Sequence, residues 1–233
     1  MKRWENKMHS GHRERLRKRF LISPDAMENH EILELLLTYS IPRKDTNAIA
    51  HELLNRFGSI SAVFDSSLDM LRSIDGVGDS TALFLKTVAS TIRLYNEDKY
   101  KPRSKTLTRD EIARIMFNKF VCRSEECLAL ALFNPKKKMV FCDIIEKGSI
   151  SNVNFFARDL LKLVVNYDAK YAIVAHNHPS GLALPSQADL DATLNLKKLL
   201  LTADVYLVDH IIVSSSDCTC LSESKWGEKN LYG

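Results

Sequence analysis

The hydrophobic pattern predicts helices in the first half of the chain. Apolar residues recur there at the three- and four-residue spacing of an amphipathic helix, and Gly and Pro mark the interruptions. A Gly76-Val77-Gly78 turn separates the last two of these segments. The predicted helices are 30–38, a segment capped by Asp45 or Thr46 and ended by Gly58, a short helix around 68–74, and a longer one over 82–92.

The second half mixes short apolar runs with helical patterns. Runs at 127–133 and 139–145 are separated by Asn134-Pro135-Lys136, as expected of a hairpin. Further strands are predicted at 170–175 and 205–213, and helices at 110–119, at 152–165 and from Ser186 onward. Strands and helices in this order predict an α/β domain with a mixed sheet flanked by helices on both faces.

The polar segment 96–105, NEDKYKPRSK, has no periodicity and predicts a linker. At 233 residues the chain is long enough for two cores. We therefore expect a helical domain over 1–100, a linker over 101–108 and an α/β domain over 109–233.

Composition is that of a soluble globular protein, with 45% hydrophobic and 27% charged residues. No apolar run has the length of a membrane span, and the charged N-terminus lacks the apolar core of a signal peptide. Five cysteines without a paired framework indicate reduced thiols, and Cys218 and Cys220, which form the one close pair, are interpreted as buried or incidental. The expected location is the cytoplasm.

Positive charge is concentrated in the opening segment. A basic arm of this kind can contact nucleic acid, and it can equally be the solvated face of a first helix. The arm consists of Lys2, Arg3, Lys7, Arg13, Arg15, Arg17, Lys18 and Arg19, opposed by Glu5 and Glu14.

The densest chemistry lies in HNHPSGLALPSQAD, residues 176–189. Side chains two apart in a strand share a face, so His176 and His178 can point at one ion while Asn177 faces away. Ser186 can cap the next helix, and Asp189 then lies in its first turn. Two histidines and one carboxylate leave a tetrahedral Zn²⁺ one open position, the pattern of a catalytic site.

A structural interpretation competes with this one. Ser186 and Asp189 also fit an acidic variant of the capping box, in which the carboxylate only serves the helix end. Histidines near a strand end can be ordinary surface residues.

The extended string, His-x-His, Pro-Ser-Gly and Pro-Ser-x-x-Asp, resembles the signature of the JAMM/MPN metal-dependent hydrolases, and specifically their RadC (UPF0758) branch. HELLNRFGS and IDGVGDSTA resemble the N-terminal region of the same family, with its helix-hairpin-helix turn. The resemblance implies a small all-α helix-hairpin-helix domain followed by an α/β MPN domain of the cytidine-deaminase-like type. Asp79 departs from a strong DNA-binding hairpin, because a carboxylate after the turn repels phosphate, so helix packing and nucleic-acid contact both stay open.

The resemblance also implies roles for individual residues. His176, His178 and Asp189 would hold zinc, Glu126 at the entrance of a strand would be the base, and Ser186 would steady an oxyanion as an alternative to capping. Glu125 is expected on the opposite face from Glu126, and Glu146 at the far end of the next strand. His210 is interpreted as a structural histidine or a partner of a ligand rather than a fourth ligand.

The expected function is zinc-dependent hydrolysis of a peptide or isopeptide bond by a metal-activated water, with an unknown peptide or protein substrate. The alternatives are a DNA-associated protein of repair or recombination, which binds DNA through the arm and hairpin or cuts it with the same metal, and a scaffold with a vestigial site. The chain lacks the P-C-x-x-C string that accompanies H-x-E in nucleobase deaminases, and it lacks the P-loop string.

Overall fold

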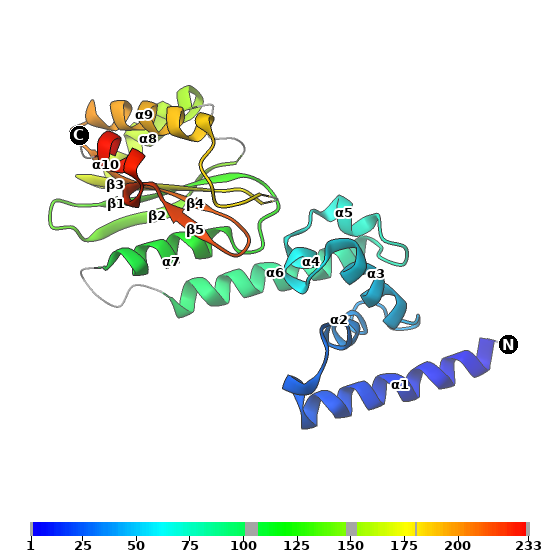
Figure 1. The fold of residues 1–233 in the computed structure, drawn as a ribbon. Helices are drawn as coiled ribbons and strands as arrows, with labels where there is room; N and C mark the ends of the chain where they lie inside the picture. The colour runs from blue at the N-terminus through cyan, green and yellow to red at the C-terminus, as the bar shows by residue number, and fades with distance from the viewer. Residues whose placement is uncertain (1, 101–106, 148–152, 180, 232–233) are drawn as a thin grey trace. The chain divides into compact units, whose positions relative to one another are not determined.

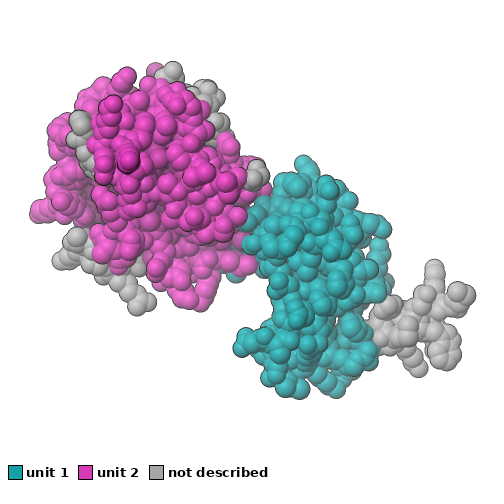
Figure 2. All heavy atoms as spheres, viewed as in Figure 1, with its two compact units in different colours: residues 1–91 teal, residues 92–233 magenta. Residues whose placement is uncertain are grey.

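The computed structural model describes residues 2–100, 107–147, 153–179 and 181–231. Most of the predicted linker, residues 101–106, lies outside this range. The chain divides into two compact units, unit 1 over 1–91 and unit 2 over 92–233, as Figure 2 shows.

Unit 1 is helical. Its core is formed by leucines that are almost completely excluded from solvent: Leu33, Leu37, Leu53, Leu71 and Leu85. Its elements are α1 (Lys2–Ile22), the 3₁₀ turn η1 (Pro24–Ala26), α2 (Asn29–Leu37), α3 (Asn47–Phe57), α4 (Ile60–Asp65), α5 (Leu68–Arg72) and the first part of α6 (Asp79–Lys99).

Glycines end or bend the chain at two points in unit 1. Gly58, at the C-terminal end of α3, has a φ of 86°, the left-handed conformation that favours glycine. Gly76, in the turn before α6, also has a φ of 86°, and a Cβ there would lie 2.7 Å from Cδ1 of Ile49. Both the backbone conformation and the close approach of Ile49 therefore require glycine at position 76.

Two helices, α4 and α6, differ from the prediction. Helix α4, capped by Ser59 at the Ala62 N–H, was not predicted, because six residues are too few for a periodic pattern. The polar segment expected to begin a linker at Asn96 is helical as far as Lys99. Arg93 and Glu97 form an ion pair of 3.3 Å one turn apart, which supports a helix without any apolar periodicity.

Unit 2 contains a five-stranded mixed sheet with the strand order β2-β1-β3-β4-β5. The pair β3 and β4 is parallel and the other neighbours are antiparallel. The elements are α7 (Arg109–Phe120), β1 (Cys127–Phe133), β2 (Met139–Lys147), α8 (Val153–Asn166), β3 (Tyr171–Asn177), α9 (Gln187–Leu201), β4 (Tyr206–Val213), β5 (Cys218–Cys220), the 3₁₀ turn η3 (Leu221–Glu223) and α10 (Lys225–Leu231).

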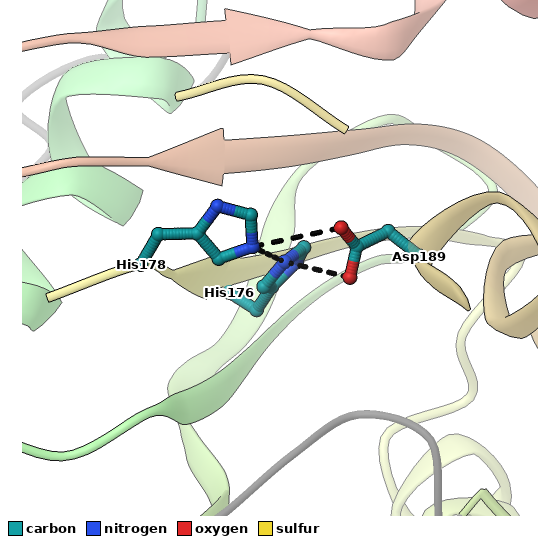
Figure 3. Close-up of side chains that lie close together, drawn as sticks. All are labelled: His176, His178 and Asp189. Carbon is teal, nitrogen blue, oxygen red and sulfur yellow. Dashed lines mark hydrogen bonds and ion pairs between the residues drawn. The ribbon is translucent and has the colours of Figure 1, made fainter. Parts of the chain in front are cut away.

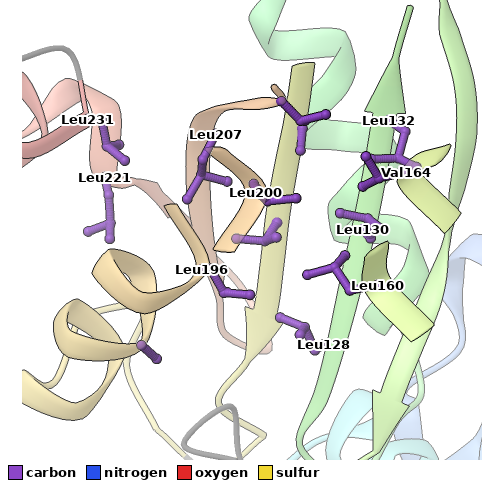
Figure 4. Close-up of a cluster of buried hydrophobic side chains, with 14 of the residues drawn as sticks. Leu128, Leu130, Leu132, Leu160, Val164, Leu196, Leu200, Leu207, Leu221 and Leu231 are labelled. Atoms are coloured by element: carbon purple, nitrogen blue, oxygen red, sulfur yellow. The ribbon is translucent and has the colours of Figure 1, made fainter. Parts of the chain in front are cut away.

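Helices cover both faces of this sheet, as predicted for an α/β domain (Figure 1). Helices α8 and α9 pack on one face through Leu160, Val164, Leu196 and Leu200 (Figure 4). Helix α7 packs on the other through Met116 and Phe120. Every residue of β1 is buried, which explains why its sequence is a continuous apolar run rather than an alternating one.

Strand β3 presents alternate residues to the two faces. Ala172 and Val174 belong to the core beneath α8 and α9, whereas Ile173 and Ala175 belong to the core beneath α7. By this alternation His176 faces the α9 side and Asn177 the α7 side. Strand β5 and helix α10 were not predicted; three residues of strand and seven of helix carry little pattern of their own.

Among the described residues, none of the helices combines the length and the apolar character needed to cross a membrane.

Candidate metal centre

Three ligand-type side chains converge where β3 ends and α9 begins. One nitrogen each from His176 and His178 and one carboxylate oxygen of Asp189 all lie within 4.8 Å of one another. The Nε2 atoms of the two histidines are 2.8 Å apart. Oδ1 of Asp189 lies 3.1 Å from Nε2 of His176, and Oδ2 lies 3.5 Å from Nε2 of His178 (Figure 3). His176 and Asp189 are buried, and His178 is the more exposed of the three.

His176 is oriented from behind by His210 of β4. Nδ1 of His176 lies 2.8 Å from Nε2 of His210, and Nδ1 of His210 lies 2.5 Å from the hydroxyl of Thr193. That hydroxyl donates to the carbonyl of Asp189 at 2.6 Å, so its oxygen accepts from His210. Burial, and then the neighbouring His176, lower the pKa of His210 well below its usual value, so the ring is neutral. His210 Nε2 must therefore accept, and His176 Nδ1 donates to it.

His178 is oriented by its own loop. Its Nδ1 donates to the carbonyl of Leu182 at 3.0 Å, which leaves Nε2 as the nitrogen that faces the cluster. The backbone N–H of Gly181 donates to the carbonyl of His178 at 3.2 Å, and a Cβ at position 181 would lie 3.3 Å from Cβ of His178. The missing side chain of Gly181 thus lets the loop lie close against the histidine.

Asp189 is oriented by the first turn of α9. Its Oδ2 accepts from the backbone N–H and the hydroxyl of Ser186, both at 2.7 Å, and its own N–H donates to Ser186 Oγ at 3.2 Å. This is the predicted capping box, and it leaves Oδ1 directed at His176. Burial raises the pKa of Asp189. A proton held between Nε2 of His176 and Oδ1 in the metal-free state, together with the hydrogen bonds from Ser186, outweighs burial and holds this pKa well below its usual range. The carboxylate is therefore ionised.

The arrangement brings three acceptors together. With Nδ1 of each histidine used as a donor, both Nε2 atoms present lone pairs toward each other and toward an ionised carboxylate. Such a group is stable only with a proton or a cation among its members, and neutral imidazoles with a carboxylate are ligands suited to Zn²⁺. Ligand atoms on a tetrahedral zinc are about 3.3 Å apart, given bonds of about 2.0 Å. The observed separations of 2.8, 3.1 and 3.5 Å fit that spacing with small movements.

Glu126 immediately precedes β1 and is exposed. Leu128 lies opposite His176 in the antiparallel pairing of β1 and β3, and it faces the core beneath α8 and α9. Glu126 stands two residues before Leu128 and just outside β1, so its place on the face of the cluster stays a prediction that extends this register by two residues.

The other two glutamates behave differently. Glu125 is exposed and lies two residues before β1, and its orientation toward the opposite face stays a prediction. Glu146 lies at the far end of β2, as predicted. Because β1 and β2 are antiparallel, the end of β2 meets the start of β1, and Glu146 lies opposite Leu128. It is therefore at the same end of the sheet as Glu126, but two strands away from β3, or about 10 Å.

In unit 1, several basic side chains of the arm have intramolecular partners. The guanidinium of Arg13 donates to the carbonyls of Ile41, Pro42 and Lys44, and the Ile41 bond measures 2.8 Å. Arg19 pairs with Glu31. At the turn before α6, Asp79 pairs with Arg72 at 2.7 Å. Arg15, in contrast, is exposed.

Sequence reasoning missed two groups that organise the centre. Thr193 stands one turn after Asp189 in α9, a spacing that marks a shared helix face but not a histidine partner. The amide of Asn177 binds the backbone at the entrance of β1, 50 residues earlier in the chain. Neither contact can be recognised from the residues that are neighbours in the sequence. Cys218 and Cys220 are free thiols, as expected.

The comparisons with known proteins show which class of α/β domain carries this cluster, namely a JAB domain. The profile of the family described as RadC-like JAB domain matches residues 106–226. The UPF0758 protein FN0909 of Fusobacterium nucleatum subsp. nucleatum is 34% identical over 218 residues, which cover 90% of this chain and 94% of that protein.

The chain belongs to the RadC family, the UPF0758 proteins, and carries its JAB domain. The resemblance stated from the sequence is thereby confirmed at the level of the family.

Proposed function

We propose that this protein is a zinc-dependent hydrolase of the JAMM type that cleaves a peptide or isopeptide bond. His176, His178 and Asp189 hold the ion, and Glu126 accepts a proton from the attacking water. Zinc bound there would polarise a carbonyl oxygen and lower the pKa of water toward about 7.

One observation carries the proposal: the Nε2 atoms of His176 and His178 lie 2.8 Å apart beside an ionised carboxylate, with the second nitrogen of each ring already occupied. A purely structural capping box would explain Asp189 and Ser186, but it would not explain why two imidazoles turn their lone pairs to the same point. Three protein ligands leave zinc one position for substrate or water, which favours catalysis over a closed structural site.

Ser186 has a defined first task in this proposal. Its hydroxyl donates to Oδ2 of Asp189 at 2.7 Å, so it holds the carboxylate with Oδ1 toward the ion. To steady an oxyanion as well, the hydroxyl would have to turn away from Asp189 during the reaction. The Ser186 hydroxyl would then serve first as the helix cap and later, during the reaction, as the group that stabilises the oxyanion.

Metal content tests the site. Purified wild-type protein, His178→Ala and Asp189→Ala are compared by mass spectrometry after exposure to equimolar zinc, with His51→Ala as a control histidine in unit 1. We expect near-stoichiometric zinc in the wild type and in His51→Ala, and little in the two site variants. A wild type that binds no zinc contradicts the proposal and favours the DNA-associated or scaffold alternative.

Substrate screening tests the reaction. Peptide, isopeptide and DNA substrates are incubated with zinc-loaded wild type, with Glu126→Gln as the inactive variant and Glu146→Gln as its matched control. The proposal requires cleavage of an amide bond that Glu126→Gln abolishes and Glu146→Gln retains. Cleavage of DNA alone, with the same dependence on the cluster, would reassign the chemistry to phosphodiester hydrolysis.

A further inference from the structure

The side chain of Asn177 binds the backbone on both sides of Glu126. Its Oδ1 accepts from the N–H of Cys127 at 2.7 Å, and its Nδ2 donates to the carbonyl of Glu125 at 3.0 Å. Asn177 is 3% exposed, and its bond to the Cys127 N–H is buried, whereas its bond to the Glu125 carbonyl is partly buried. The orientation of the amide is fixed by these partners, because one is a donor and the other an acceptor.

These two bonds hold the two peptide groups that flank Glu126. The Glu125 carbonyl belongs to the peptide group before the Cα of Glu126, and the Cys127 N–H belongs to the one after it. The two soft backbone torsions of a residue are the rotations of those peptide groups about its Cα. The amide of Asn177 therefore fixes the backbone of Glu126, which precedes the first residue of β1 and is not itself in the sheet.

Strand β3 thus serves the centre from both of its faces. His176 points to the cluster, and the next residue, Asn177, points to the opposite face and reaches the entrance of β1. Leu128 lies opposite His176 in the register, so the segment held by Asn177 is the one whose parity directs Glu126 to the cluster.

We infer that Asn177 is a positioning residue that places the Glu126 carboxylate beside the metal centre. This inference rests on the proposed function. An aspartate at position 177 would keep the acceptor but lose the donor, and an alanine would lose both, which leaves the Glu125 carbonyl and the Cys127 N–H without their partner.

A double-mutant cycle tests the inference on the full-length protein. Asn177→Ala and Asn177→Asp are made in the wild-type and the Glu126→Gln backgrounds, and hydrolysis of any amide substrate is measured with zinc. If Asn177 acts through Glu126, Asn177→Ala lowers kcat about 100-fold in the wild type, within the range of general base catalysis. In the Glu126→Gln background it lowers kcat less than about threefold, because a group acting through an absent partner adds no further loss.

Two further readouts do not require turnover. The visible spectrum of the Co²⁺-loaded protein reports groups near the ion. We expect Glu126→Gln and Asn177→Ala to change it alike, the double variant to add nothing, and Co²⁺ affinity to stay within about threefold. Hydrogen exchange at the Cys127 amide should accelerate in Asn177→Ala and in Asn177→Asp less so, since the acceptor is kept.

The outcomes separate the two proposals. A wild type that binds neither zinc nor Co²⁺ contradicts the proposed function and, with it, the role of Asn177. Stoichiometric metal together with equal losses from Asn177→Ala in both backgrounds overturns the positioning role alone and leaves Asn177 a structural residue.

Discussion

Nε2 of His210 accepts a hydrogen bond of 2.8 Å from Nδ1 of His176, and this bond decides which nitrogen of His176 faces the cluster. The proton of Nδ1 is held in the buried interior, so Nε2 keeps its lone pair. Partners of this kind fix both the tautomer and the orientation of a metal-ligating ring.

Replacing His210 by alanine should weaken metal binding. We expect about a 10- to 100-fold loss of zinc affinity, the usual cost of removing a partner of a ligating histidine. The zinc affinity is measured by competition with a chelator of known affinity. Circular dichroism first shows that the variant is folded. Ser222→Ala is the control, because Ser222 donates to Asp209, the neighbour of His210, at 2.6 Å. Equal affinity loss in both variants would mean that the effect comes from general loosening of β4.

The turn before α6 offers a matched pair of glycines. Gly76→Ala should destabilise unit 1 by about 1–3 kcal/mol, because an alanine there is strained at positive φ and would lie 2.7 Å from Cδ1 of Ile49. Gly78→Ala has no atom within 4 Å of the new Cβ and should cost less. Urea denaturation followed by circular dichroism measures both. A larger loss for Gly78→Ala would contradict the structure of this turn.

Cys142 of β2 should be a slow nucleophile. Burial raises the pKa of its thiol to about 11, and the folded state therefore opposes formation of the reactive thiolate. At pH 8 the thiolate fraction is about one in a thousand, and alkylation should accelerate about tenfold per pH unit until the pH approaches 11. Mass spectrometry of iodoacetamide-treated protein, with Cys142→Ser to assign the peptide and urea-unfolded protein as the fast reference, checks this. Labelling as fast in the native as in the unfolded protein would show that the thiol is not buried.

The basic arm should be probed at Arg15 rather than at Arg13. Arg13 donates to three carbonyls between Ile41 and Lys44, so Arg13→Gln should lower the stability of unit 1 by about 1–3 kcal/mol whether or not DNA binds. Arg15 is exposed, and Arg15→Gln should leave stability unchanged within about 0.5 kcal/mol.

A salt series of DNA binding then separates the alternatives. If the arm contacts phosphate, Arg15→Gln reduces the salt dependence of affinity by about one charge. Loss of binding in Arg13→Gln alone would report unfolding and not recognition.

Much of unit 2 follows from local pattern. The apolar run of β1, the turn at Asn134-Pro135 and the alternation around His176 each depend on neighbouring residues, and the strands formed where these patterns predict them. The convergence of His176, His178 and Asp189 also follows from local pattern. The end of a strand holds the first histidine, a short loop holds the second, and the capping box holds the carboxylate, so the three side chains have little freedom to separate.

What the sequence does not predict depends on distant contacts. The partner of His210 depends on the parallel register of β3 and β4, in which His210 lies opposite Val174. The proximity of Glu146 to the start of β1 depends on the antiparallel turn of the hairpin. The boundary between the units falls inside α6, because its ion-paired polar end stays helical where composition alone predicts a linker.

Strand β3 presents His176 to the cluster on one face and Asn177, whose amide binds the backbone around Glu126, on the other, so both contacts depend on one strand register. A slip of one residue along β3 would turn the amide of Asn177 toward the cluster and the imidazole of His176 into the core beneath α7. Because side chains alternate between the two faces, a shift of one residue in the register of β3 moves every side chain to the other face. Insertions and deletions in this strand should therefore be absent from functional relatives, and so should those between His178 and Leu182, because the Leu182 carbonyl orients the His178 ring.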